Sequence, residues 1–292
     1  MKTGLVLEGG AMRGLFSAGI IDVLMENDVQ FDGIVGVSAG AAFGCNMKSR
    51  QAGRAIRYNT KFANDWRYCS LRSLLTTGDI FGGEFCYHYL PKHLDIFDNE
   101  AFNNNPQEFF AVCTDVETGE PIYKRLMKAD DECYEWIRAS ASMPLASKIV
   151  NINGRKVLDG GISDSIPLKF MQQQGYEKNI VVTTQPAGYV KEKNSFLPLM
   201  RLQLRRYPRF LDAVANRHEM YNAQLEYVAE QERQGKTLVL RPESALTIGH
   251  ITHDADKMWE TYNIGRALAE KRLEEIKEYV APPLSPLREE IM

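Results

Sequence analysis

The stretch FDGIVGVSAGAAFG, residues 31–44, decides how the chain folds. Apolar residues run up to Val37, and small residues surround Ser38. This pattern predicts a buried strand that turns directly into a helix, with Ser38 at the turn. Gly36 and Gly40 lack a side chain, so they let the strand and the helix approach each other. Ser38 is therefore either a nucleophile displayed on a strained turn or a turn residue without chemistry.

A second glycine-rich turn lies in LEGGAMRGLFSAG, residues 7–19, between a short apolar run and a helical pattern. Consecutive backbone N–H groups in such a turn form a nest that binds anions, and in acyl transfer the nest serves as an oxyanion hole. The spacing excludes the G-x-G-x-x-G turn of a dinucleotide site, and no G-K-[ST] of a P-loop follows. The candidate oxyanion-hole residues are Gly9, Gly10, Ala11, Met12, Arg13 and Gly14.

A third candidate, Asp159, lies in VLDGGISDSIPL, residues 157–168. It follows the second arm of a hairpin that Asn153-Gly154 predicts, and it precedes two glycines. A serine nucleophile needs a base within hydrogen-bond reach, and the five histidines stand in no recognisable catalytic setting. Asp159 is therefore the candidate base, with the capping of a turn as the alternative. A free aspartic acid has a pKa of about 3.9, so it would take the serine proton only in concert with attack.

The order of the predicted elements indicates the fold class. Short apolar runs alternate with helical patterns, which predicts an α/β fold, a three-layer α/β/α sandwich with a mainly parallel central sheet. The C-terminal part adds helices to this core. Strands are expected at 4–7, 31–37, 109–114, 148–152, 155–158, 179–184 and 237–240, and helices at 15–25, 39–47, 129–140, 197–234 with a break at Pro208, and 254–280.

We expect one domain over residues 1–280, followed by a Pro-rich flexible tail at 281–292. The catalytic core would occupy about 4–185 and the helical part about 190–280. The short run at 237–240 resembles a strand that returns to the core sheet, which favours one domain over two.

Composition and charge limit the partners. A net charge of −3 argues against a nucleic-acid binder, and five scattered cysteines predict a reducing, cytoplasmic compartment. No apolar run is long enough to span a bilayer, so any membrane contact would be peripheral, at its inner surface. The basic and apolar stretch 195–210 is either such a docking helix or a packed helix with solvated arginines. The pair His250 and His253 is spaced like metal ligands but lacks partners, so capping or surface roles are expected and no metal.

The aromatic residues of 58–70 allow two interpretations. They would line a pocket for an acyl chain or pack in an ordinary core.

Taken together, three stretches resemble the signatures of patatin-like phospholipases, in the order that the family has them. Thr114-Asp115 with Thr118-Gly119 and the run at 139–144 also resemble family stretches, so the resemblance covers roughly residues 4–185. The three signatures are Gly9-Gly10-Ala11-Met12-Arg13-Gly14, Gly36-Val37-Ser38-Ala39-Gly40 and Asp159-Gly160-Gly161.

The resemblance implies a Ser–Asp dyad acyl hydrolase on a three-layer α/β/α fold, without histidine, metal or other cofactor. Ser38 would be the nucleophile and Asp159 the general base. Backbone N–H groups of residues 10–12 would form the oxyanion hole, with Arg13 beside them.

Two positions depart from the family pattern. Ala11 replaces the usual third glycine of the first signature, and Ser165 stands where many members have asparagine. Neither change removes a catalytic group.

The sequence thus predicts a serine acyl hydrolase that cleaves carboxylic esters of lipids, or other small esters, through an acyl-enzyme. The alternatives are a transacylase that uses the same dyad and a lipid-binding protein with a silent site. The oligomeric state is not predicted.

Overall fold

The computed structural model describes residues 1–281 of the 292 in the chain. At its centre lies an eight-stranded sheet with the order β5-β6-β3-β2-β1-β7-β8, and β4 pairs with β3 off this path. Strands β3, β2, β1, β7 and β8 run parallel, whereas β4 and β6 run antiparallel to β3, and β5 runs antiparallel to β6. The strands are β1 (Lys2–Leu7), β2 (Gly33–Val37), β3 (Glu108–Asp115), β4 (Pro121–Arg125), β5 (Val150–Ile152), β6 (Arg155–Asp159), β7 (Tyr176–Val182) and β8 (Thr237–Leu240).

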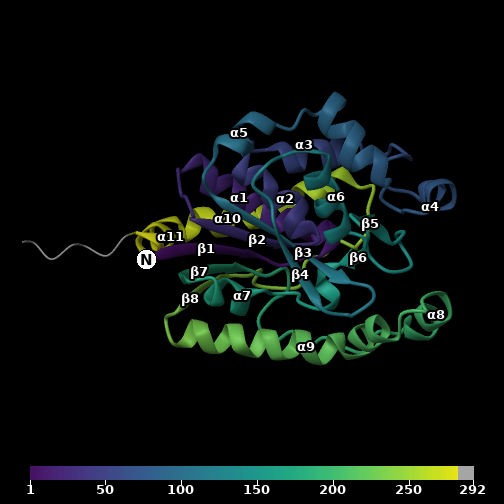
Figure 1. Cartoon of the computed structure of the whole chain (residues 1–292). Helices are drawn as coiled ribbons and strands as arrows, with labels where there is room; N and C mark the ends of the chain where they lie inside the picture. Colours follow the sequence, from purple (N-terminus) through teal and green to yellow (C-terminus); the bar gives the residue numbers. More distant parts are fainter. Residues whose placement is uncertain (282–292) are drawn as a thin grey trace, which may run out of the picture.

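Helices cover both faces of the sheet, which gives the expected three layers (Figure 1). Helices α1, α2, α6 and α10 lie on one face, and α7 and the long α9 lie on the other. The α-helices are α1 (Gly14–Glu26), α2 (Ala39–Lys48), α3 (Arg54–Lys61), α4 (Leu71–Thr77), α5 (Asn99–Asn104), α6 (Asp131–Ser140), α7 (Leu168–Gln173), α8 (Leu197–Gln203), α9 (Pro208–Arg233), α10 (Ala255–Lys271) and α11 (Leu273–Val280). Two 3₁₀ turns are η1 (Ala11–Arg13) and η3 (Gly160–Ile162), and η2 (Phe85–Leu94) is a π-helix.

The central strands are buried on both faces. Every residue of β2 is buried, as is every residue of β1 after Lys2. Strands covered by helices on both sides need continuous apolar runs instead of alternation, which is the pattern that the sequence has. Because β1, β2 and β7 run parallel, their carboxyl ends meet at one end of the sheet, to the right in Figure 1.

The C-terminal part is tied closely to this core. Helix α10 crosses α1 where a Cβ at Gly265 would lie 2.0 Å from the carbonyl oxygen of Phe16. Strand β8 adds to the sheet parallel to β7, as the sequence predicted. Because α10 is anchored in this way, the loop before it is held near the carboxyl ends of the strands.

Most predicted elements are found within a few residues of their expected bounds, and one prediction is wrong. The expected helix at 254–280 is two helices, because α10 ends at Lys271 and α11 begins at Leu273. Between them the guanidinium of Arg272 donates to the carbonyl oxygen of Val239 in β8, and the break lets α11 bury Ile276 in the core.

The predicted tail at 281–292 lies, apart from its first residue, outside the described residues. Within residues 1–281, no helix combines the length and the apolar character needed to cross a bilayer.

Candidate active site

The sharp turn at Ser38 is the centre of the site. Ser38 follows β2, precedes α2 and has φ 55° and ψ −121°, a left-handed backbone conformation that costs a non-glycine residue about 1–3 kcal/mol. Its N–H donates to Oγ of Ser140 (2.9 Å), and that hydroxyl donates to the carbonyl oxygen of Val112 in β3 (2.6 Å). Two hydrogen bonds from neighbouring elements therefore hold the strained turn in place.

Two glycines make room for this turn, as the sequence predicted. A Cβ at Gly40 would lie 2.4 Å from the carbonyl oxygen of Leu7 in β1, and one at Gly36 would lie 2.5 Å from the carbonyl oxygen of Gly40. The start of α2 therefore packs directly on β1 and β2. This contact places Ser38 next to the glycine-rich turn that follows β1.

The glycine-rich turn lies against Ser38. A Cβ at Gly9 would approach the Cβ of Ser38 to 2.8 Å. The N–H groups of Gly10, Ala11 and Met12 bond to no acceptor within residues 1–281, whereas Arg13 donates its own to Gly10 (3.1 Å). Three neighbouring amides next to Ser38 are thus available to an anion.

Two further positions complete this turn. Ala11, at the position of the usual third glycine, has φ 50°, again in the left-handed region. Gly14 begins α1 against α2, because a Cβ there would lie 2.6 Å from the Cβ of Ala39. The alanine therefore adds backbone strain to the turn.

Asp159 reaches the same place from the last residue of β6. Its side chain is buried, and its Oδ1 accepts the N–H of Gly161 (2.7 Å). Its backbone is fixed by the hydroxyl of Thr114, which donates to its carbonyl oxygen (2.8 Å), and by its own N–H, which donates to Ser142 (2.9 Å).

The charge of Asp159 is set by opposing effects. Burial raises the pKa of its carboxyl group, whereas the charge of Arg217, the nearby hydroxyl of Ser38 and the N–H of Gly161 lower that pKa. The hydroxyl of Ser38 is thus close enough to the carboxyl of Asp159 to affect its pKa, although the two residues lie far apart in the sequence.

Helix α9 supports the turn that follows Asp159. The Nε of Arg217 donates to the carbonyl oxygen of Gly161, which also accepts the hydroxyl of Ser165 (2.7 Å). The Oε1 of Gln224 accepts the N–H groups of Ser165 (3.2 Å) and Ile166 (3.0 Å). The sequence prediction missed Arg217 and Gln224, because no local pattern on a long polar helix marks the two residues that face this turn.

An apolar pocket opens on one side of Ser38. Its volume is about 100 Å³, and its walls come mainly from α2, α3 and the segment 58–97. Tyr58 and Tyr68 of the stretch 58–70 line it and also belong to a buried hydrophobic cluster, so the structure agrees with a pocket lining and with core packing. The lining residues are Ala11, Met12, Ser38, Ala39, Ala42, Phe43, Cys45, Arg54, Tyr58, Asn59, Tyr68, Phe81, Cys86, Tyr87, Leu90, Pro91, Phe97, Tyr134, Ile137, Ala141 and Met143.

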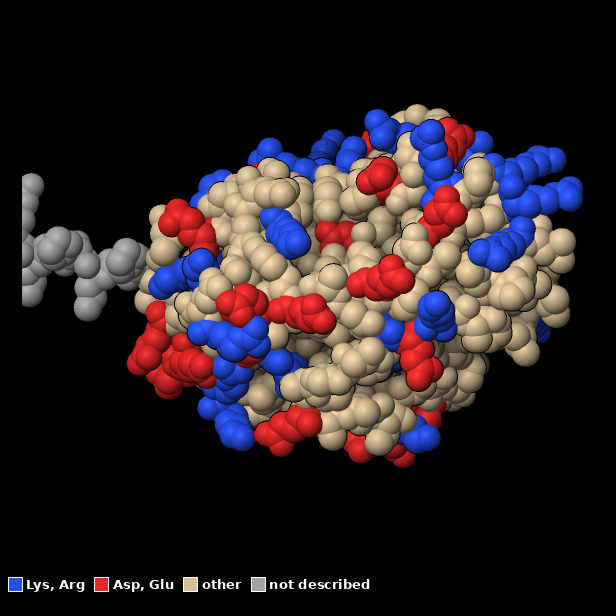
Figure 2. Space-filling model, turned by 90° about the horizontal axis from the view of Figure 1, so that it is seen from below, with Lys and Arg blue, Asp and Glu red and all other residues tan. Residues whose placement is uncertain are grey.

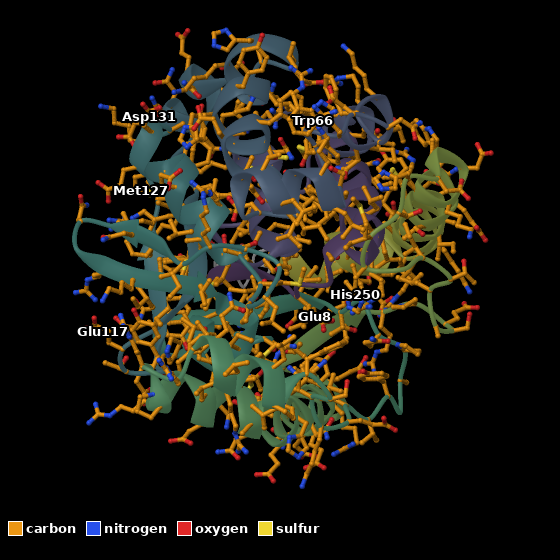
Figure 3. All side chains as sticks on the ribbon, turned by 90° about the vertical axis from the view of Figure 1, so that its right-hand side faces the viewer. Glu8, Trp66, Glu117, Met127, Asp131 and His250 are labelled. Atoms are coloured by element: carbon orange, nitrogen blue, oxygen red, sulfur yellow. The ribbon has the colours of Figure 1, made fainter. Side chains whose placement is uncertain are left out.

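Polar groups gather on the other side of the glycine-rich turn, where Figure 3 shows Glu8 and His250 close together at the end of the sheet. Glu8 is buried, and its carboxyl group accepts the hydroxyl of Tyr221 and the N–H of Thr184. Burial raises the pKa of Glu8, and these two hydrogen bonds oppose the rise. Arg13 turns outward here, and its Nη1 lies 3.1 Å from Nε2 of His250.

The other histidine of the predicted pair has a structural role. Nδ1 of His253 contacts the carbonyl oxygen of Ala63, and Asp254 caps α10 by accepting the N–H groups of Asp256 and Lys257. In the described part of the chain no three His, Cys, Asp or Glu side chains are grouped to hold a metal ion.

A serine at a strained strand–helix turn, beside a buried aspartate and free amides, defines a candidate acyl-transfer site on an α/β/α sandwich. The family model described as patatin-like phospholipase matches residues 5–171, so the chain belongs to this family. A second model, described as a domain of unknown function (DUF6363), matches residues 207–281.

Two individual relatives have sequence identities to the chain of 30% and 28%. The chain is 30% identical to the uncharacterized protein YjjU of Escherichia coli (strain K12) over 194 residues, which cover 64% of this chain and 53% of that protein. It is 28% identical to the lysophospholipase nte1 of Aspergillus terreus (strain NIH 2624 / FGSC A1156), over 99% of this chain and 19% of that protein. The chain thus spans about half and about a fifth of the lengths of these two relatives.

A solved structure is also similar. The crystal structure of VipD from Legionella pneumophila aligns with a TM-score of 0.47 at 12% identity, over 94% of this chain and 67% of that one.

Proposed function

We propose that the chain is a serine acyl hydrolase that cleaves carboxylic esters of lipids. One observation carries the proposal: the hydroxyl of Ser38 and the carboxyl of Asp159 are neighbours between free backbone amides and an apolar pocket. Family membership and a relative named lysophospholipase support the same reaction class.

In the proposed reaction, Oγ of Ser38 attacks the ester carbonyl carbon while Asp159 accepts the hydroxyl proton. A raised pKa makes the buried carboxylate a stronger base than an ordinary aspartate, and the charge of Arg217 limits that rise. The oxygen of the tetrahedral intermediate would accept the N–H groups of residues 10–12, each of which contributes a few kcal/mol.

Collapse of the intermediate releases the alcohol, which takes the proton from Asp159, and leaves the acyl group on Ser38. Water activated by the same carboxylate then releases the acid. The acyl chain would occupy the apolar pocket, so the alcohol leaves on the opposite side. A transacylase would differ only in accepting the acyl group on a second alcohol.

We propose that the substrate is taken from a membrane surface. Helix α8 exposes Phe196 just before it and Leu199 and Leu202 within it, with relative exposures of 63%, 53% and 71%. Exposed arginines 201, 205, 206 and 209 surround them, and Lys and Arg side chains gather at this end of the molecule in Figure 2. Apolar side chains beside cationic ones favour docking on an anionic bilayer.

A second exposed helix supports the same orientation. Helix α4 exposes Leu71 (71%) and Leu75 (86%). Figure 1 shows α4 and α8 projecting from the same end of the molecule, the end at which the parallel strands finish.

A fluorophosphonate probe tests the proposal without knowledge of the substrate. We expect the probe to label the wild type and Ser244→Ala, an exposed serine control, but not Ser38→Ala. Asp159→Asn should keep the acceptor for Gly161 yet lose labelling and ester hydrolysis by at least 10³-fold. Absence of labelling in the wild type would favour a silent lipid-binding protein, and acyl transfer to added glycerol would favour the transacylase.

A further inference from the structure

Four cationic or ionisable side chains converge beside the glycine-rich turn, on the side away from the acyl pocket. Arg13 belongs to this turn and contacts His250 (3.1 Å). Nζ of Lys191 lies 5.0 Å from the centre of the Tyr221 ring, whose hydroxyl binds Glu8 just before the turn. Arg217 comes from α9, and its Nε donates to the carbonyl oxygen of Gly161.

These cations lack the partners that other cations in the molecule have. Arg138 pairs with Asp79 and Arg54 with Asp95, but Arg13, Lys191 and Arg217 have no carboxylate within 4.0 Å among residues 1–281. The buried Nε of Arg13 likewise bonds to no acceptor in that part of the chain. The charge of Arg217 acts on Asp159, but Arg13 and Lys191 gather without an ion pair, which favours the binding of an anionic ligand.

The nearest carboxyl group does not neutralise the cluster. Glu8 is committed to Tyr221 and Thr184, and burial raises its pKa. Burial lowers the pKa of Lys191 to about 8, with Arg217 and Arg13 adding to this effect and Glu8 opposing it. Burial and the charges of Arg13, Lys191 and Arg217 also lower the pKa of His250.

His250 adds a free donor. An arginine only donates, so Arg13 fixes Nε2 of His250 as an acceptor and leaves the proton of the neutral ring on Nδ1. Within the described residues this Nδ1–H has no acceptor, which is the arrangement that a phosphate oxygen would complete.

We infer that Arg13, Lys191 and His250 form a subsite for a phosphomonoester on the leaving alcohol, which makes an anionic lipid phosphate the preferred substrate over neutral or choline-bearing esters. The inference rests on the proposed function. Arg13 lies within residues 5–171, which the patatin-like family model matches, whereas Lys191 and His250 lie beyond them, so the C-terminal part contributes two of the three subsite residues. Arginine and lysine are the side chains that proteins use for phosphate.

The test compares three soluble esters with one acyl chain: hexanoyl lysophosphatidic acid, hexanoyl lysophosphatidylcholine and monohexanoyl glycerol. We expect the wild type to hydrolyse the first with a kcat/KM at least tenfold above the other two. Lys191→Met should reduce this preference about tenfold and His250→Gln about threefold, mainly through KM. Lys193→Met, an exposed lysine two residues away, should keep it.

The pH dependence gives a second readout. The preference should fall from pH 7 to pH 9 in the wild type as Lys191 loses its proton, and it should change less in Lys191→Met. The groups that act on Lys191 from neighbouring elements are Arg13, Glu8, Arg217 and, through Arg13, His250.

Two results would overturn the subsite: equal hydrolysis of the three esters by the wild type, or a preference that Lys191→Met leaves intact. A Lys191-dependent effect of inorganic phosphate on the neutral ester, without preference for lysophosphatidic acid, would reassign the site to free phosphate and also overturn it. Failure of the proposed function is distinct, because Ser38→Ala would then hydrolyse the neutral ester as fast as the wild type.

Discussion

The two sides of Ser38 are built from different parts of the chain. The apolar pocket is lined entirely by residues between Ala11 and Met143, within the region that the patatin-like family model matches. The cationic side takes Lys191, Arg217 and His250 from the C-terminal part. Under the proposed function, the first region would supply the reaction and the acyl site, whereas the C-terminal part would select the head group and adjust the base.

Arg217→Gln is the strongest test of this division, because it removes a charge of the C-terminal part that acts on the base. Arg217 lowers the pKa of Asp159, so its loss raises that pKa. The base works ionised, so the acid limb of the pH profile of kcat/KM should move to higher pH. At pH values below the shifted limb, activity should fall about tenfold for each unit by which the pKa of Asp159 rises.

The control for this prediction is Arg233→Gln, an exposed arginine at the end of the same helix. It should leave both the profile and the rate unchanged. If Arg217→Gln lowers the rate without moving the acid limb, Arg217 only supports the turn at Gly161, and the two regions are not divided as described.

The sequence predicted the turn at Ser38 and the hairpin before Asp159 well, because the signals for both are local. The turn at Ser38 follows from apolar residues before it and small residues after it, and Asn153-Gly154 forms its hairpin with φ values of 51° and 82°. Arg217, Gln224 and Lys191 were missed because only the packing of α9 and the loop after β7 brings them to the site. The break at Arg272 was missed because the helical pattern continues through it.

Ala42→Leu tests the acyl side. Ala42 lines the pocket, and an isobutyl group there would occupy much of its roughly 100 Å³. Overpacking of this kind costs about 1–3 kcal/mol. The ratio of kcat/KM for decanoyl to butanoyl p-nitrophenyl esters should therefore fall roughly twentyfold.

The preference for lysophosphatidic acid should survive Ala42→Leu, because the head-group side is built separately. The exposed Ala52→Leu serves as the matched control and should change neither ratio. A loss of both selectivities in Ala42→Leu would mean that the two sides of Ser38 are coupled.

Leu202→Glu tests whether the exposed helix of the C-terminal part has a docking role. Leu202 is 71% exposed, so the change should leave the fold intact while weakening sedimentation with anionic vesicles about fivefold. Ile264→Glu, at 39% exposure on α10, should bind as the wild type does. Equal binding by all three proteins, at low and at high salt, would remove α8 from the membrane contact.

Ala11→Gly should have the smallest effect and concerns the turn that separates the two sides. Ala11 has φ 50°, a conformation that glycine adopts without the steric cost of a Cβ. The free energy of unfolding in urea should rise by about 0.5–1 kcal/mol, the strain relief being partly offset by the larger entropy of the unfolded glycine. Ala41→Gly, in the regular part of α2, should instead lower it by about 1 kcal/mol. A lower free energy of unfolding in both variants would mean that the turn is not strained at Ala11. Contacts other than this backbone conformation would then hold its amides in place.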